Sequence, residues 1–164
     1  MLFNLRDVFI SPGAKKELKY SLDMSDLSFN GLHPFSEPAE VFAVAENKAG
    51  LVKLSLDVSY SYSGFCDRCG CEVVKHYNKS FEHIVVTELT GDADDEYIEA
   101  PDREVETDTI VMSDVILDLP SKFLCKDDCK GLCTVCGKNL NEGKCDCQAD
   151  RTDPRLEVLK QLLN

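Results

Sequence analysis

The chain has 164 residues, 43% of them hydrophobic, which is enough for one globular domain, or for one domain with an appended segment. Its formal net charge is −12 at pH 7. An acidic surface repels phosphates, so this balance argues against broad nucleic-acid binding by the main body and favours a basic protein partner. No apolar run reaches the roughly 18 residues of a membrane span. The first residues do not resemble a secretory signal, so we expect a cytoplasmic protein whose thiols stay reduced.

The first two-thirds of the chain carries the alternating pattern of β-strands. Residues 52–62 alternate strictly, with apolar side chains at even positions and polar ones at odd positions. The pattern resumes after Cys71, although Lys75, Lys79 and His83 interrupt its apolar face. Residues 16–23 and 39–46 predict further strands. We therefore expect an α+β fold with an antiparallel β-rich body, either a curved sheet or a barrel-like closure, and a few helices. The spacing of the C-terminal cysteines, C-x2-C followed by C-x-C, adds the expectation of a zinc-knuckle segment there.

The chain divides into two predicted parts. Residues 1–120 form the β-rich body, with a net charge of −13, and residues 121–164 form a cysteine-rich segment with a net charge of +1. Within the body, residues 91–108 hold nine acidic residues and one basic residue, which indicates a solvated connector.

Two helices are predicted. Residues 109–119 carry a helical stripe of Met112, Val115, Ile116 and Leu119, capped by Thr107 or Asp108 and ended by Pro120. A second helix begins at Asp153 and Pro154 and closes the cysteine-rich segment.

Eight of the nine cysteines fall into four short pairs. Zinc binds four thiolates at the corners of a tetrahedron, and two cysteines on one tight turn direct both sulfurs at the same point. Four such pairs predict two zinc ions per chain. The predicted ligands are Cys66, Cys69, Cys125, Cys129, Cys133, Cys136, Cys145 and Cys147.

The assignment of the pairs to sites has two solutions. Cys133 and Cys136 are close in sequence to Cys145 and Cys147, which leaves Cys125 and Cys129 to join the hairpin pair Cys66 and Cys69. The rival grouping joins Cys125 and Cys129 to Cys133 and Cys136. In either case we expect Cys71 to be an ordinary strand residue, and Gly137, directly after Cys136, to need a positive φ.

Sites of four cysteines are coordinatively full, which indicates a structural role for the metal. A rubredoxin-like iron site is an alternative, because iron also binds such pairs, and a disulfide scaffold is another. No nucleophile elbow, phosphate-binding glycine loop or cysteine–histidine pair is present in the sequence, so we expect no enzymatic activity. Basic residues near the cysteines could contact RNA, or could only balance the thiolate charge. They are Lys126, Lys130, Lys138, Lys144, Arg151 and Arg155.

The cysteine-rich segment has the form LC-x3-C-x-GLC-x2-CG-x-NLNEG-x-C-x-C and is followed by DPRLEVLKQLL at 153–163. This pattern resembles the bacterial YceD family, the large ribosomal RNA subunit accumulation proteins. FCDRC at 65–69 and ILDLP at 116–120 also match the family.

The resemblance implies a non-enzymatic ribosome biogenesis factor that supports accumulation of the large-subunit (23S) rRNA. The partner we expect is a basic large-subunit ribosomal protein or assembly factor, with rRNA as a second candidate through the C-terminal segment. No membrane and no small-molecule substrate is expected. The alternatives are a zinc-binding protein-interaction module unrelated to ribosomes and an iron electron carrier.

Overall fold

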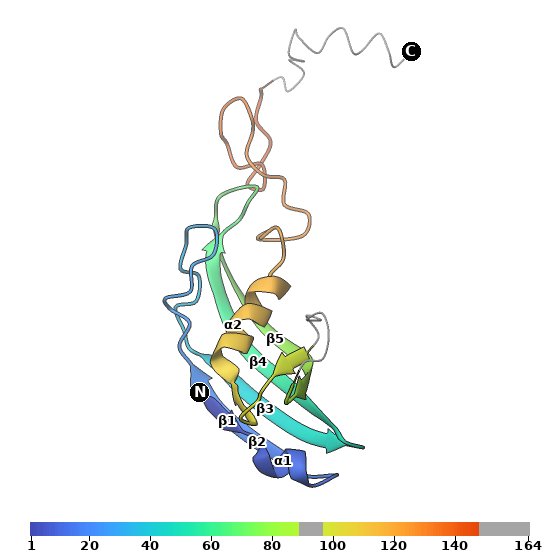
Figure 1. The fold of residues 1–164 in the computed structure, drawn as a ribbon. Helices are drawn as coiled ribbons and strands as arrows, with labels where there is room; N and C mark the ends of the chain where they lie inside the picture. Colours follow the sequence, from blue (N-terminus) through green and yellow to red (C-terminus); the bar gives the residue numbers. More distant parts are fainter. Residues whose placement is uncertain (89–96, 148–164) are drawn as a thin grey trace, which may run out of the picture. The chain divides into compact units, whose positions relative to one another are not determined.

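The computed structural model describes residues 1–88 and 97–147, which form two compact units (Figure 1). The first, here called the sheet unit, comprises Met1–Gly64 and Val73–Ser121. The second, the cysteine unit, comprises Phe65–Glu72 and the described part of Lys122–Asn164. The helix predicted from Asp153 lies outside the described residues. Among those that are described, no helix is long and apolar enough to cross a membrane.

One five-stranded sheet forms the body of the sheet unit. Its strands follow the order β2-β3-β4-β5-β6, with β2, β3 and β4 antiparallel and β6 parallel to β5. Figure 1 shows long, curved strands that do not close into a barrel, so the predicted β-rich fold is confirmed as an open, curved sheet. The strand bounds are β2 Lys15–Leu22, β3 Ala39–Lys48, β4 Leu51–Phe65, β5 Glu72–Val86 and β6 Tyr97–Glu99.

Strand β4 confirms the alternation read from the sequence. Every second residue from Val52 to Tyr62 is buried, while Ser59 and Asp57 face the other way and are exposed. Burial of six consecutive apolar side chains on one face sets the register of the strand, because a slip of one residue would turn all of them outward. The small residues Ala43 and Ala45 extend this core onto β3.

The polar residues on the inner face of β5 are explained by the helix α2 (Thr107–Asp118). His83 and Lys79 lie on the same face as the buried Val85. His83 Nε2 lies 2.7 Å from Asp114 Oδ2, and Lys79 Nζ lies 2.7 Å from Asp118 Oδ2. Two of the three residues that interrupt the apolar pattern, Lys79 and His83, are therefore explained by their pairing with the helix.

Helix α2 begins earlier than predicted. It starts at Thr107, and Glu106 is the cap residue without a side-chain hydrogen bond. The Thr107 hydroxyl does not cap the helix, because it donates to the Met1 carbonyl at 3.0 Å. The buried residues are Thr107, Val111 and Val115, so the buried stripe is centred on Val111 rather than on Met112.

Four short elements were not predicted. Strand β1 (Leu2–Asn4) pairs antiparallel with β7 (Glu104–Glu106), and α1 (Arg6–Ile10) follows β1. Strands β6 and β7 lie within the expected acidic connector, so the described part of that segment is built into sheets rather than being only a solvated link. The pairing is anchored by single apolar residues such as Val105, which is 2% exposed.

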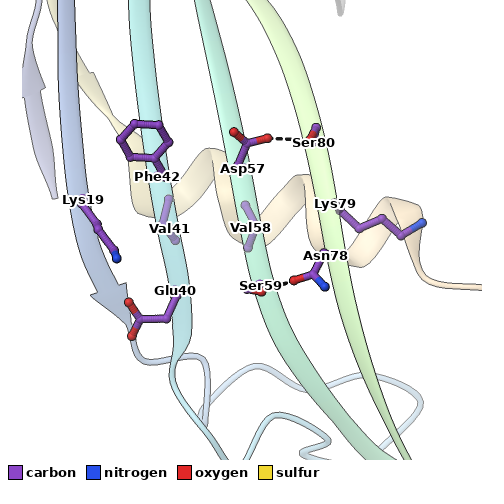
Figure 2. Close-up of a pocket in the computed structure, with 10 residues that line it drawn as sticks. All are labelled: Lys19, Glu40, Val41, Phe42, Asp57, Val58, Ser59, Asn78, Lys79 and Ser80. Atoms are coloured by element: carbon purple, nitrogen blue, oxygen red, sulfur yellow. Dashed lines mark hydrogen bonds between the residues drawn. The ribbon is translucent and has the colours of Figure 1, made fainter.

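The outer face of the sheet is polar. The Ser80 hydroxyl donates to Asp57 and the Ser59 hydroxyl donates to Asn78, each across the β4–β5 pair (Figure 2). These residues line a shallow groove that also runs past Lys19 on β2. The sheet therefore presents hydrogen-bonding groups on its outer face, beside apolar side chains such as the exposed Val74, and buries most of its apolar residues in the core.

Candidate metal centre

The loop between β4 and β5 is a tight turn that carries the first cysteine pair. The Gly70 N–H donates to the Cys66 carbonyl at 2.8 Å, and the Cys66 N–H donates to the Cys71 carbonyl at 2.8 Å. Gly70 has a φ of +69°, a backbone conformation that residues other than glycine rarely adopt. This turn places the sulfurs of Cys66 and Cys69 on the same side of the loop.

The pair Cys133 and Cys136 lies on a turn of the same construction. The Gly137 N–H donates to the Cys133 carbonyl at 2.9 Å, and the Cys133 N–H donates to the Lys138 carbonyl at 2.8 Å. Gly137 has a φ of +73°, which confirms the prediction made for it. The role of Gly70 was missed, although the repeat of C-x2-C-G in the sequence contains the signal.

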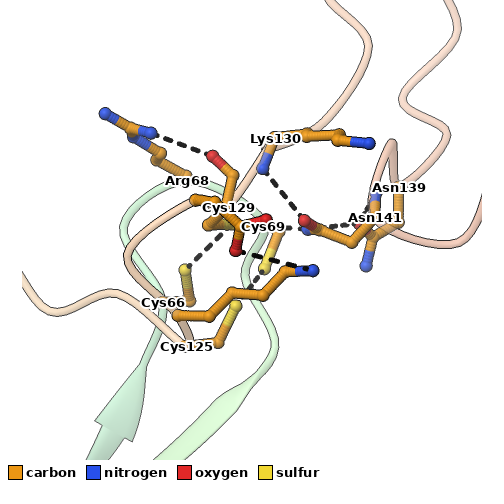
Figure 3. Close-up of polar contacts among 10 residues, drawn as sticks. Cys66, Arg68, Cys69, Cys125, Cys129, Lys130, Asn139 and Asn141 are labelled. Atoms are coloured by element: carbon orange, nitrogen blue, oxygen red, sulfur yellow. Dashed lines mark hydrogen bonds and ion pairs between the residues drawn. The ribbon is translucent and has the colours of Figure 1, made fainter.

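Five sulfur atoms gather at the first turn, all of them within the cysteine unit. Figure 3 labels four of these cysteines, namely Cys66, Cys69, Cys125 and Cys129. Cys66 Sγ lies 3.8 Å from Cys129 Sγ, and Cys69 Sγ lies 3.6 Å from Cys125 Sγ. Cys69 Sγ also lies 3.3 Å from Cys71 Sγ. Cys71 forms with Cys66, Cys69 and Cys125 a group whose sulfurs all lie within 4.8 Å of one another. The structure thus groups Cys71 with three of the expected ligands, and it places the fourth, Cys129, beside Cys66.

The second group contains the sulfurs of Cys133, Cys136, Cys145 and Cys147, which lie within 4.8 Å of one another. All nine cysteines lie in the described part of the chain and are free thiols. The shortest sulfur–sulfur distance given above, 3.3 Å, is far longer than the about 2.05 Å of a disulfide bond.

Three residues that the sequence did not identify as part of the site support the first group, and Figure 3 shows two of them, Asn141 and Arg68. Asn141 Nδ2 donates to Cys129 Sγ at 3.3 Å, and Asn141 Oδ1 accepts from the Lys130 N–H at 2.9 Å. The Arg68 guanidinium donates to the Cys129 carbonyl at 2.9 Å. Asp67 Oδ2 accepts from the Phe123 N–H at 2.6 Å. Hydrogen bonds of this kind hold ligands in place around a metal.

The first cysteine of each turn is the one whose thiolate is most stabilised. Burial raises the pKa of Cys66, but backbone N–H groups, among them those of Cys69 and Arg68, outweigh it and lower the pKa to about 6. The N–H groups of Cys136 and Val135 likewise lower the pKa of Cys133 to about 6. Both turns thus supply the deprotonated sulfur that a metal requires.

Other cysteines are pushed the opposite way by the neighbouring sulfurs. Contact with Cys136, together with burial, raises the pKa of Cys147 to about 12. Burial and the surrounding thiols also raise the pKa of Cys125. If the remaining thiols of such a group also lost their protons, the thiolates would repel one another. A bound dication would relieve that repulsion.

The donor chemistry and the spacing fit a tetrahedral metal site. A metal–sulfur distance of about 2.3 Å gives sulfur–sulfur edges of about 3.8 Å, close to the two distances that join the hairpin cysteines to Cys125 and Cys129. Thiolates are soft ligands that select zinc or iron over calcium and magnesium. Four sulfurs around one ion leave no position open for a substrate, so such sites organise the fold.

The basic residues predicted for RNA contact are exposed where the structure describes them. They are Lys126, Lys130, Lys138 and Lys144. Lys138 Nζ donates to the Lys144 carbonyl at 3.0 Å, and Lys126 Nζ lies 3.9 Å from Asp128 Oδ1. Arg151 and Arg155 lie outside the described residues.

Comparisons with known proteins relate the chain to one family. The sequence profile described as "Large ribosomal RNA subunit accumulation protein YceD" matches residues 54–163, which is more than half of the chain and includes every cysteine. The chain is also 35% identical over 51 residues to the large ribosomal RNA subunit accumulation protein YCED homolog 1, chloroplastic, of Arabidopsis thaliana. That similarity spans 31% of this chain and only 16% of the relative's length. No solved structure matches the chain.

Proposed function

The chain belongs to the YceD family of large ribosomal RNA subunit accumulation proteins, and we propose that it is a non-enzymatic cytoplasmic factor supporting accumulation of the large-subunit rRNA. The observation that carries the proposal is the family match over residues 54–163, which spans the hairpin cysteines and the cysteine-rich segment. The resemblance drawn from the cysteine motif is confirmed by that match.

The two cysteine groups each hold one structural zinc ion in this proposal. One ion is bound through Cys66, Cys69, Cys125 and Cys129. The other is bound through Cys133, Cys136, Cys145 and Cys147. The near-tetrahedral sulfur edges and the repeated C-x2-C-G turn support this assignment, and the lack of an open position supports a structural role.

The acidic sheet unit is the binding surface for a basic partner in this proposal. It carries 9 Lys and Arg against 21 Asp and Glu, a net charge of −12, whereas residues 65–72 and 122–164 carry 9 against 9. A large-subunit ribosomal protein or assembly factor with a basic surface matches this charge, and the unit's repulsion of phosphate disfavours direct RNA binding there.

Contact with rRNA is a second candidate, carried by the exposed lysines of the cysteine unit. Its competitor is that these lysines only balance the thiolates, because a zinc ion with four thiolates has a net charge of −2. Two such centres would take the cysteine unit from a formal charge of zero to about −4.

Two measurements test the proposal. Elemental analysis of the purified chain is expected to give two zinc ions and no iron; one ion, or iron in place of zinc, contradicts the metal assignment. The chain is then used as bait in lysates of growing cells, with and without nuclease. Recovery of a basic large-subunit protein that survives nuclease supports the proposed function. Recovery of no ribosomal component in either condition contradicts it, whatever the metal content.

A further inference from the structure

The first cysteine group has one sulfur more than a tetrahedral ion can bind. Cys66, Cys69 and Cys125 gather with Cys71, all four sulfurs being within 4.8 Å of one another. Cys129 lies beside the same residues, with its sulfur 3.8 Å from Cys66 Sγ. Two sets of four therefore share three members and differ in whether Cys71 or Cys129 is the fourth.

The position of Cys71 is specific to the first of the two equivalent turns. Cys71 is the fifth residue after Cys66, and its carbonyl accepts the Cys66 N–H. Lys138 holds the corresponding place in the second turn, where its carbonyl accepts the Cys133 N–H and its side chain is exposed. The turn does not require a thiol at this place, so the half-buried Cys71 is an addition to it.

The distances do not select between the two candidates for the fourth position. The 3.8 Å edge between Cys66 and Cys129 has the length expected for a tetrahedral site. The 3.3 Å separation of Cys69 and Cys71 is about half an ångström shorter than such an edge, but a small rotation of a half-buried side chain corrects it.

Cys129 is held by groups that a change elsewhere in the unit could release. Asn141, from the loop between Cys136 and Cys145, donates to its sulfur, and Arg68 donates to its carbonyl. Its place beside the other thiols thus depends on the loop that belongs to the second cysteine group.

From these observations, and resting on the proposed metal function of the site, we propose that Cys71 and Cys129 are interchangeable fourth ligands of a single ion. In the exchange one metal–sulfur bond to Cys71 forms and one to Cys129 breaks, and the proton of the Cys71 thiol passes to the departing Cys129 sulfur through solvent. The ion stays four-coordinate and nothing is oxidised. The segment at 129–133 can then leave the hairpin without release of the metal.

Cobalt(II) binding to the full chain tests this, because the absorption of cobalt reports the number of thiolates bound to it. The variants are Cys71→Ser, Cys129→Ser, the double variant, and Cys66→Ser as the control that removes a shared ligand. The expected result is that both single variants bind two cobalt ions with four-thiolate spectra, with first-site affinity reduced by no more than about tenfold. The double variant and Cys66→Ser are expected to lose a thiolate from the first site, with a loss of affinity above about 100-fold.

Two results overturn the exchange. If Cys129→Ser alone gives a three-thiolate spectrum while Cys71→Ser is unchanged, Cys71 is not a ligand. If the two results are reversed, Cys71 is a permanent ligand and Cys129 is not one. The unaltered spectrum of the second site shows in each variant that the unit has folded. A wild-type chain that binds only one cobalt ion, with Cys66→Ser indistinguishable from it, overturns the proposed metal site itself.

Discussion

Two glycines of the cysteine unit, Gly131 and Gly137, adopt a left-handed backbone conformation that the fold of the unit requires. Gly131 and Gly137 have almost the same φ, +72° and +73°. A Cβ at Gly137 would meet nothing within 4 Å, whereas a Cβ at Gly131 would lie 3.0 Å from the Arg68 carbonyl oxygen. The two positions therefore share the same conformational strain and differ in steric crowding.

This difference predicts unequal effects of the same substitution. Gly137→Ala is expected to lower the free energy of unfolding of the cysteine unit by about 1–2 kcal/mol, the cost of a left-handed residue with a side chain. Gly131→Ala is expected to cost more, because the Arg68 backbone must also move. Urea unfolding of the metal-loaded chain, followed by the release of metal to a chromogenic chelator, measures both. Equal losses would show that the Arg68 contact does not matter.

At the scale of residues, the sequence predicted only some of the residues that form the two cysteine groups. Pair spacing identified eight cysteines and the need for a positive φ at Gly137, because both follow from local geometry. Spacing could not identify Cys71, since its approach to Cys69 depends on how the hairpin turn closes. Nor could it identify Asn141, whose bond to Cys129 joins residues twelve positions apart.

At the scale of elements, the strand predictions succeeded where the residues of one strand form a complete apolar face by themselves. Strand β4 supplies its own alternating pattern, so its burial could be read directly. The face of β5 could not be interpreted fully, because Lys79 and His83 are explained only by Asp118 and Asp114 on a helix that follows later in the chain. Strands β1 and β7 are three residues each and depend on pairing with each other, which leaves no periodic signal.

The loop at 138–142 connects the two cysteine groups within their unit. The Leu140 N–H donates to the Gly131 carbonyl at 2.9 Å, and the Leu132 and Asn139 backbones form a β-bridge. Asn141 adds the bond to Cys129 Sγ. A residue from the loop of one group therefore helps to fix a ligand of the other.

Asn141→Ala is consequently expected to weaken metal binding at the first site, although Asn141 lies between ligands of the second. Loss of one N–H···S bond corresponds to about 0.5–1.5 kcal/mol, or roughly 3- to 10-fold in affinity. Glu142→Ala is the control, since Glu142 is exposed on the same loop and its side chain bonds only to Asn139 Nδ2 among the contacts described. Cobalt titration resolves the two sites. A larger loss at the second site than at the first would contradict this direction of coupling.

At the scale of the whole molecule, charge is distributed unequally between the two units. The sheet unit carries the whole formal net charge of −12, and part of this charge lies in the described residues of the acidic connector. Attraction of a basic protein by such a surface is long-ranged and is screened by salt within about 8–10 Å at physiological ionic strength. Binding through this unit should therefore weaken steadily as salt is added.

The exposed lysines of the cysteine unit lead to a different prediction, which concerns RNA binding. Each lysine that contacts a phosphate contributes about one unit to the slope of log affinity against log salt. Replacement of Lys126, Lys130, Lys138 and Lys144 by alanine should flatten that slope if the unit binds rRNA, and should change nothing if these lysines only balance the thiolates. The same variant should keep its affinity for the basic protein partner, because that surface lies on the sheet unit.

The last prediction asks whether the connector itself is the contact or only adds to the net charge. Three exposed carboxylates of the connector are replaced by their amides in one variant, and three exposed carboxylates elsewhere on the sheet unit in a control with the same change of net charge. If the connector touches the partner, the first variant should lose about 1–3 kcal/mol more binding free energy than the control. The reason is that it removes charge pairs at the interface, whereas the control only weakens the long-range attraction. Equal losses in a binding titration at two salt concentrations would mean that net charge alone attracts the partner. The connector residues are Glu99, Asp102 and Glu106, and the control residues are Asp7, Asp26 and Glu88.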